Sequence, residues 1–351
     1  MFRMPPEWAP HERTWMAWPV PNQTFGGEDD LAASRRAWAE VARAVRRFEP
    51  VTMVVGPGQS TEARALLGPD IDLVERDLDD AWMRDIGPTF VTDGTRLAAV
   101  DWVFNGWGAQ EWARWDHDSA IAREIAGLVG VPVHSSPLVN EGGGIHVDGE
   151  GTVLLTKTVQ LGPERNPGWT RAGVEAEIHA RLGTSKAIWL ERGLTADYPP
   201  PLRDRQEGAP GGYGTLGHVD IVAAFAGPGV IVAHTQPDPA HPDHELCRSN
   251  VAFLRTQTDA RGRPIEVVEV PAPTAVRDEE GGWADYSYIN HYVCNGGVVL
   301  CAFDDPRDEE AAALFRRLYP DREVTLVDAR TIFAGGGGIH CITQQQPMTG
   351  V

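Results

Sequence analysis

The sequence predicts an α/β fold, a five-bladed pseudosymmetric α/β propeller made of repeated ββαβ units. Three observations support it: five amphipathic helical patterns, a short β-rich run after each of them, and a hairpin pattern between each run and the next helix. The N- and C-terminal segments together complete one unit. A repeat whose ends complete each other indicates one closed domain over residues 1–351, and an ordinary α/β sheet with accidental spacing is the alternative.

The helices are predicted from apolar residues that recur at helical spacing. In the first helix, Trp38, Val41 and Val45 share one face. In the third, Thr170 is a suitable N-cap and Gly183 a suitable end. The five predicted helices cover residues 30–48, 118–129, 170–182, 243–255 and 308–318.

The strands are predicted from short runs rich in β-branched residues. A run follows each helix, at residues 51–55, 131–133, 187–190, 265–268 and 324–327. Hairpins around Gly-containing turns come next, at residues 89–100, 145–155, 221–232 and 292–300. The fifth hairpin joins residues 339–342 to residues 14–17 and closes the ring. The Pro- and Gly-rich residues 198–214 are interpreted as an inserted loop, because the repeat resumes directly after them.

Composition limits the class of protein. The 351 residues carry a formal net charge of -19, which disfavours nucleic acid and anionic membrane surfaces as partners and favours a small cation; a merely solvated acidic surface is the alternative. No stretch approaches the roughly 20 apolar residues of a membrane helix, and the start lacks a signal-peptide pattern. We therefore expect a cytoplasmic protein, and the sequence leaves homo-oligomer formation open.

The four cysteines form neither a CxxC pair nor a disulfide framework, so each is expected to be a buried or a reactive thiol. One stretch superficially resembles a metal site, but its spacing is not that of a zinc site, and Asp243 suits a helix N-cap better. We therefore expect no metal there. The residues of that stretch are His234, His241, His244, Glu245 and Cys247.

Polar motifs recur at one place in each unit, between the β-rich run and the hairpin. Equivalent positions converge near the axis of a pseudosymmetric ring, so residues far apart in the chain are expected to share a pocket. The motifs are Trp-Met-Arg-Asp-Ile-Gly-Pro at 82–88, Asn-Glu-Gly-Gly-Gly-Ile-His at 140–146, Gly-His-Val-Asp at 217–220, Tyr-Ile-Asn-His at 288–291 and Gly-Gly-Gly-Gly-Ile-His-Cys at 335–341.

The inventory of this pocket points to chemistry on a guanidinium group. Cys341 is a nucleophile that must react as a thiolate, and His218 can move the proton. Asp85 and Asp220 can fix a planar cation that donates several hydrogen bonds and place its carbon in line with the sulfur. We expect a covalent thiouronium intermediate, loss of ammonia and hydrolysis to a ureido product.

Each signal also has a plain structural interpretation. The glycine run can be a turn, and His218 and Asp220 can lie on one face of a strand and bond there. Arg84 and Asp85 can form a surface ion pair, and Trp82 can belong to the core.

At these motifs the sequence resembles the agmatine deiminase family of the guanidine-modifying superfamily, which includes peptidylarginine deiminases. The similarity runs from Met-Pro-Pro-Glu-Trp-Ala-Pro-His-Glu at 4–12 to Gly-Gly-Ile-His-Cys-Ile-Thr-Gln-Gln-Gln-Pro at 337–347. It implies a five-bladed propeller and conversion of agmatine to N-carbamoylputrescine and ammonia in polyamine synthesis, without a metal or organic cofactor.

The resemblance also implies residue roles. Cys341 would be the nucleophile and His218 the acid and base, with Asp85 and Asp220 binding the guanidinium and Glu141 orienting His218. Substrate-binding positions would further include Trp82, flanking the methylene chain, and the glycines Gly337 and Gly338.

One departure affects substrate choice. Many members carry an acidic stretch before Gly-His-x-Asp, where this chain has Gly-Tyr-Gly-Thr-Leu at 212–216, so an acid for the distal amine must come from elsewhere, such as Asp197 or Glu207. A deiminase of free or peptidyl arginine, with Arg84 or Arg203 facing the substrate carboxylate, is the alternative. Other classes are a metal-dependent hydrolase using His218 and Asp220 and a non-catalytic propeller scaffold.

Overall fold

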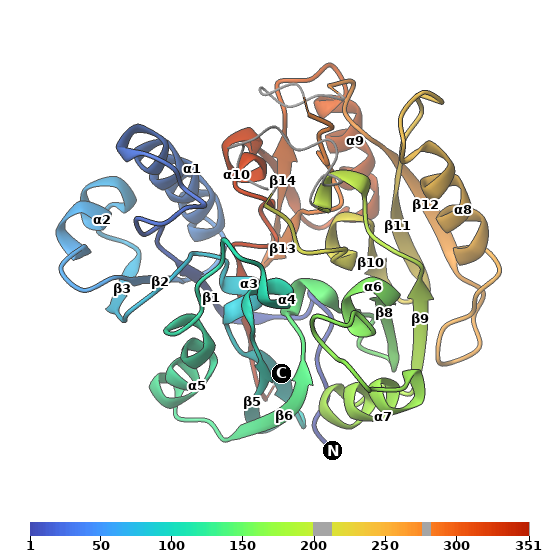
Figure 1. Cartoon of the computed structure of the whole chain (residues 1–351), viewed down its shortest axis with the longest axis horizontal. Coiled ribbons are helices and arrows are strands. Elements are labelled where there is room, and N and C mark those ends of the chain that lie inside the picture. Colours follow the sequence, from blue (N-terminus) through green and yellow to red (C-terminus); the bar gives the residue numbers. More distant parts are fainter. Residues whose placement is uncertain (199–212, 276–281, 351) are drawn as a thin grey trace.

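The computed structural model describes residues 1–198, 213–275 and 282–350, and these residues form five β-sheets (Figure 1). In four sheets the first two strands are antiparallel and the third is parallel to the second. These sheets are β4 (Thr89–Thr92), β5 (Leu97–Val103) and β6 (Val133–Val139); β7 (His146–Val147), β8 (Thr152–Thr156) and β9 (Lys186–Leu190); β10 (Ala223–Gly227), β11 (Val230–Thr235) and β12 (Glu266–Pro271); and β13 (Tyr292–Cys294), β14 (Gly297–Ala302) and β15 (Glu323–Asp328).

The remaining sheet joins the two ends of the chain. Its order is β16 (Gln344–Pro347), β1 (His11–Ala17), β2 (Val51–Val55) and β3 (Asp72–Glu75). The C-terminal strand β16 pairs antiparallel with β1, and β1 pairs parallel with β2. The predicted joining of the termini is thus confirmed, while β3 is an additional strand that the sequence pattern did not indicate.

Five long helices lie at the periphery, each between the last two strands of a repeated unit (Figure 1). All five predicted helices are confirmed, with ends shifted by at most two residues. They are α1 (Glu28–Arg46), α5 (Asp118–Val129), α7 (Arg171–Leu182), α8 (His244–Leu254) and α9 (Asp308–Leu318). Shorter helical segments are α2 (Ser60–Leu67), α3 (Met83–Ile86), α4 (Gly106–Ala109), α6 (Lys157–Gln160), α10 (Arg330–Ala334), η1 (Gly142–Gly144), η2 (Thr195–Asp197) and η4 (Val219–Ile221).

The core fills the space between consecutive sheets. Strand β8 is buried on both faces: Leu154 packs in a cluster with β10 and β11, while Val153 and Leu155 pack in a cluster with β4 and β5. Successive side chains of a strand point to opposite faces, so one central strand serves two clusters. Each sheet is therefore covered on both faces, and polar loops are left at the strand ends.

Several predicted strand limits are wrong. Residues 339–342 form turns rather than a strand, and the pairing with β1 starts at Gln344. Ile221 belongs to η4 instead of the following hairpin, and β6 starts at Val133 rather than at residue 131. The predicted inserted loop lies mostly outside the described residues. Among the described residues, no helix is both long and apolar enough to cross a membrane.

Candidate active site

The polar motifs lie directly before the first strand of each sheet. Asp85 is in α3 before β4, and Glu141 precedes η1 and β7. Asp220 is in η4 before β10, Asn290 precedes β13, and Cys341 precedes β16. The equivalent positions of five units thus supply one site, as the repeat predicted. His218 and Asp220 lie in a short 3-10 turn, so the interpretation that they share a strand face is wrong.

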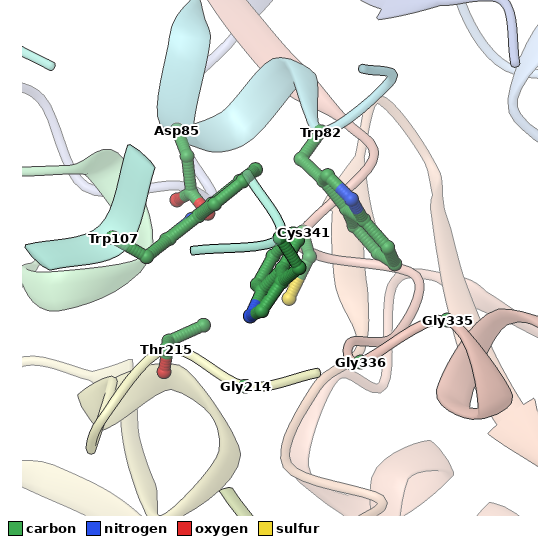
Figure 2. Close-up of a pocket in the computed structure, with 9 residues that line it drawn as sticks. Trp82, Asp85, Trp107, Gly214, Thr215, Gly335, Gly336 and Cys341 are labelled. Carbon is green, nitrogen blue, oxygen red and sulfur yellow. The ribbon is translucent and has the colours of Figure 1, made fainter. Parts of the chain in front are cut away.

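A narrow pocket, partly open to solvent, is lined by Cys341. Figure 2 shows Trp82 and Trp107 on either side of Cys341, with Asp85 behind Trp107. The lining residues are Trp82, Asp85, Trp107, Trp112, Gly214, Thr215, Gly335, Gly336 and Cys341. Trp82 also packs edge-on against Trp38, at 5.5 Å between ring centroids, so it belongs to the core and to the pocket wall at once.

Asp85 is held in place by two donors. The backbone N–H of Gly143 donates to its Oδ1 at 2.9 Å, and the indole N–H of Trp107 donates to its Oδ2 at 2.8 Å. Burial raises the pKa of Asp85; the charge of His218 opposes this, and the charges of Asp220 and Glu141 add to it. Arg84 points away and bonds to Gln345, so a surface ion pair between Arg84 and Asp85 is excluded.

His218 lies between carboxylates. Its Nε2 is 3.2 Å from Oε2 of Glu141, and its Nδ1 is 3.8 Å from Oδ2 of Asp85. Burial lowers the pKa of this histidine, but the charges of Asp85, Glu141 and Asp220 outweigh burial and raise the pKa of His218 to about 9. Glu141 is in turn fixed by Arg165, whose Nε donates to both of its carboxylate oxygens at 3.0 and 3.1 Å.

Cys341 lies beside a carboxylate and an amide. Its Sγ is 3.6 Å from Oδ2 of Asp220, and Nδ2 of Asn290 donates to it at 3.3 Å. Burial and the negative charges of Asp220 and Asp85 hold the pKa of the Cys341 thiol well above its usual range. These influences favour the protonated thiol at neutral pH in the free site.

The side chains of three motifs converge above Gly143. A Cβ atom added to this glycine would lie 2.4 Å from Nδ1 of His218, 3.0 Å from Oδ1 of Asp85 and 3.0 Å from Oδ2 of Asp220. Two buried carboxylates this close to one point repel each other unless a cation lies between them. The arrangement suits a guanidinium, whose planar N–H groups can donate to both.

Gly337, Gly338 and Asp197 do not line the pocket. The glycines that line the pocket are Gly335 and Gly336 instead of Gly337 and Gly338. Gly337 still lies next to the thiol, since a Cβ atom added to it would be 3.0 Å from Sγ of Cys341. Asp197 accepts hydrogen bonds from the backbone N–H and the hydroxyl of Thr215, so it is committed to its own loop. Glu207 and Arg203 lie outside the described residues.

The suspected metal stretch is arranged for other contacts. Asp243 precedes α8 as expected, but its carboxylate caps no helix N–H and instead accepts the backbone N–H and hydroxyl of Thr195. His244 Nδ1 donates to the carbonyl of Gln236 at 2.7 Å. Within the described ranges, the side chains that bring metal-ligating atoms together lie in another part of the chain.

Four residues of the site escaped sequence reasoning. Trp107, Arg165, Asn290 and Glu7 contact the predicted groups directly or through one partner. Asn290 stood in a quoted motif, which was its only signal. Arg165 lies in a loop and Trp107 in the short helix α4, and neither segment follows the repeated pattern, so their placement became visible only in the structure.

The arrangement combines a buried thiol, a protonated imidazole and two converging carboxylates. It can hold a planar cation against the sulfur, supply a proton to a departing amine and later take one from water.

Comparisons with known proteins agree with this chemistry. Residues 3–347 match the model of the Porphyromonas-type peptidyl-arginine deiminase family. A Streptomyces coelicolor protein named "Putative agmatine deiminase" is 74% identical over 349 residues, 99% of both chains. An agmatine deiminase of Stutzerimonas stutzeri is 38% identical, over 99% of this chain and 95% of that protein. The solved agmatine deiminase of Enterococcus faecalis superposes with a TM-score of 0.90 at 32% identity, covering 100% of this chain and 96% of that chain.

Proposed function

The chain belongs to the Porphyromonas-type peptidyl-arginine deiminase family, and on this premise we propose that it is an agmatine deiminase, a hydrolase of C–N bonds in linear amidines. It converts agmatine and water to N-carbamoylputrescine and ammonia, a step of polyamine synthesis. The observation that carries the proposal is the convergence of two buried carboxylates, Asp85 and Asp220, on one point beside the sulfur of Cys341.

Substrate binding activates the nucleophile. The guanidinium of agmatine enters between Asp85 and Asp220 and replaces their repulsion with charge-assisted hydrogen bonds. Burial and the negative charges of the same carboxylates hold the pKa of Cys341 high, and the positive charge of the guanidinium opposes the effect of the carboxylates. The thiol proton is released to solvent, and the thiolate therefore forms when its electrophile is already in place.

The reaction then proceeds in two halves. The thiolate adds to the guanidinium carbon, the C–N bond to one NH₂ group breaks, and His218 gives its proton to the departing ammonia, which leaves an S-alkylthiouronium on Cys341. A water molecule next adds to the same carbon with neutral His218 taking one of its protons. The C–S bond then breaks, the second proton passes to the sulfur of Cys341, and the ureido product is released. Glu141, held by Arg165, keeps the His218 ring oriented throughout.

The pocket favours agmatine over free arginine. Among its described lining residues there is no Arg or Lys that would pair with an α-carboxylate. Arg84, one proposed partner of that carboxylate, is buried and bonds to Gln345 and the carbonyl of His340. Trp82 and Trp107 provide apolar walls suited to a methylene chain. Asp197 is committed to Thr215, so the group that meets the distal amine is left to be identified.

The proposal also covers the closure of the fold, the domain organisation and the location of the protein. The five sheets close into a five-bladed propeller, because β16 joins β1 and buried clusters fill the space between consecutive sheets. Residues 1–351 then form a single catalytic domain. A role in polyamine synthesis fits a cytoplasmic location.

Ammonia release by the purified protein tests this function. Agmatine, arginine and an arginine-containing peptide are supplied in parallel, each with and without a chelator. We expect release from agmatine that survives chelation. Ammonia release from arginine or the peptide alone would identify that compound as the substrate instead of agmatine. Loss of activity on chelation would favour a metal-dependent hydrolase.

A further inference from the structure

A buried histidine without an assigned role connects the site to the start of the chain. His340 precedes the nucleophile, and its Nδ1 lies 2.7 Å from Oδ2 of Asp220. Its Nε2 lies 2.8 Å from Oε2 of Glu7, a residue 333 positions away. An ionised carboxylate only accepts hydrogen bonds, so if Glu7 and Asp220 are both ionised, both ring nitrogens of His340 must donate and the ring must be an imidazolium.

Glu7 is itself fixed as an anion. Its Oε1 accepts the backbone N–H of Val293 at 2.8 Å, and its Oε2 lies 3.5 Å from Nη2 of Arg84. Burial would raise the pKa of Glu7, but the charges and hydrogen bond of His340 and Arg84 hold it far below its usual range. The position of the His340 ring is therefore set from the side away from the pocket.

Asp220 needs a cation that stays in place. It is buried, its Oδ2 lies 3.6 Å from Sγ of Cys341, and it is close to the carboxylate of Asp85, so without a neighbouring cation its negative charge would be disfavoured. Within the described residues, no Arg or Lys side chain hydrogen-bonds to it. Its second oxygen, Oδ1, is buried without a hydrogen-bond partner in that part of the chain and is left for a ligand.

We propose that His340 is a positioning residue: its imidazolium, clamped between Glu7 and Asp220, keeps Asp220 ionised and turns its free Oδ1 toward the guanidinium. This inference rests on the proposed function, since it assigns Asp220 to guanidinium binding. Through its contact with His340, Glu7 in the N-terminal segment then helps to keep Asp220 ionised.

A metal site at the same place is the competing interpretation. Ligand atoms of Glu7, His146 and His340 lie within 4.8 Å of one another, beside a cavity that Arg84 also lines. However, Nδ1 of His146 accepts the backbone N–H of Phe225 at 3.2 Å, so its Nε2 carries the proton and cannot bind a metal in this tautomer. The adjacent guanidinium of Arg84 further disfavours a cation.

Other charged groups surround the pair formed by His340 and Asp220. Burial raises the pKa of Asp220, but the hydrogen bond and charge of His340 outweigh it and lower that pKa; burial and Arg84 lower the pKa of His340, but its two carboxylates outweigh them and raise it. The titratable and charged groups that face the pair are Glu7, Arg84, Asp85, His146, His218, His291 and Cys341.

Two measurements on the full-length protein test the proposal. NMR of the ¹⁵N-histidine-labelled protein reads the protonation of His340 directly, with His340→Gln assigning the signal. Agmatine binding is measured by calorimetry from pH 5 to 8 in a Cys341→Ser background, which prevents turnover. The matched control is His146→Gln, a buried histidine of the same cavity that does not contact Asp220.

We expect His340 to be doubly protonated at pH 7. Agmatine affinity should fall about 10- to 100-fold in His340→Gln, the loss expected for one charge-assisted hydrogen bond. The affinity of this variant should fall further as the pH decreases. The control variant His146→Gln should keep the parent affinity. Glu7→Gln should show a smaller loss in the same direction and serves if His340→Gln does not fold. A singly protonated His340, or equal losses in the glutamine variants of His340 and His146, would overturn the inference. Absence of agmatine turnover by the wild type would instead contradict the proposed function and leave the NMR result standing.

Discussion

The Sγ atom of Cys341 lies 3.6 Å from Oδ2 of Asp220, so the proposed nucleophile and the carboxylate proposed to bind the substrate are neighbours in the structure. A thiolate formed there without substrate would face an anion at close range in a buried site. The same proximity is productive once a guanidinium lies between the carboxylates, because the cation then stabilises both groups.

Gly143→Ala should reduce kcat/KM by at least about 100-fold, the scale of loss when reacting groups are displaced by 1 Å, because its Cβ would enter the space shared by His218, Asp85 and Asp220. Steady-state ammonia release measures this effect. The control is Gly127→Ala in α5, where no atom lies within 4 Å of the added Cβ. Parent-like activity in Gly143→Ala would mean that the guanidinium lies elsewhere.

Asp220→Asn should impair both agmatine binding and turnover at saturating substrate, since the variant loses the charge that fixes the guanidinium plane. We expect KM to rise and kcat to fall, each by about tenfold or more, as for loss of a charged hydrogen bond. An unchanged kcat at saturation would count against a direct role of Asp220.

The pH dependence of kcat/KM should show an acid limb near the pKa of His218, about 9. In the resting site both the thiol and the imidazolium are protonated, and the reactive form has one proton fewer, with Cys341 ionised and His218 still charged. Raising the pH through neutrality therefore increases kcat/KM, which levels off at about 9. A flat profile between pH 6 and 9 would contradict this assignment.

Glu141→Gln should lower the free energy of unfolding and shift the acid limb of the pH profile of kcat/KM. The change leaves the buried guanidinium of Arg165 without its charged partner, which we expect to cost about 3–5 kcal/mol in the free energy of unfolding, measured with denaturant. It also removes a charge that raises the pKa of His218, so the limb moves to lower pH. The control is Glu191→Gln, whose exposed pair with Lys157 should contribute less than about 1 kcal/mol. Equal stability losses in the two variants would contradict the buried pair's importance.

Much of the fold could be predicted because its repeated elements carry local signals. The helices α5 and α9 were predicted to the residue, since apolar spacing and turn residues lie within each segment. Strand β3 and helix α2 were missed because they add to one unit and repeat nowhere else. Residues 339–342 are apolar enough for a strand, but in the structure they hold Cys341 in a turn.

The candidate site divides in the same way. Cys341, His218 and Asp220 stand in motifs at equivalent places of the repeat, and the structure brings them together. Arg165 and Glu7, which influence the charges of these groups, stand outside the repeated motifs. Their contacts are fixed only by tertiary packing, and Glu7 lies 333 residues from its partner His340. The sequence therefore indicated the reacting groups and Glu141 beside His218, but not the contacts made by Arg165 and Glu7.

The most direct test of the account is the mass of Cys341 during turnover. Wild-type protein mixed with agmatine is quenched in acid and digested, and the peptide that contains Cys341 is weighed. We predict an adduct with the mass of agmatine less ammonia on Cys341, absent in Cys341→Ser, which should keep its fold and release no ammonia. Ammonia release that continues in Cys341→Ser, or an adduct on another residue, would contradict the account.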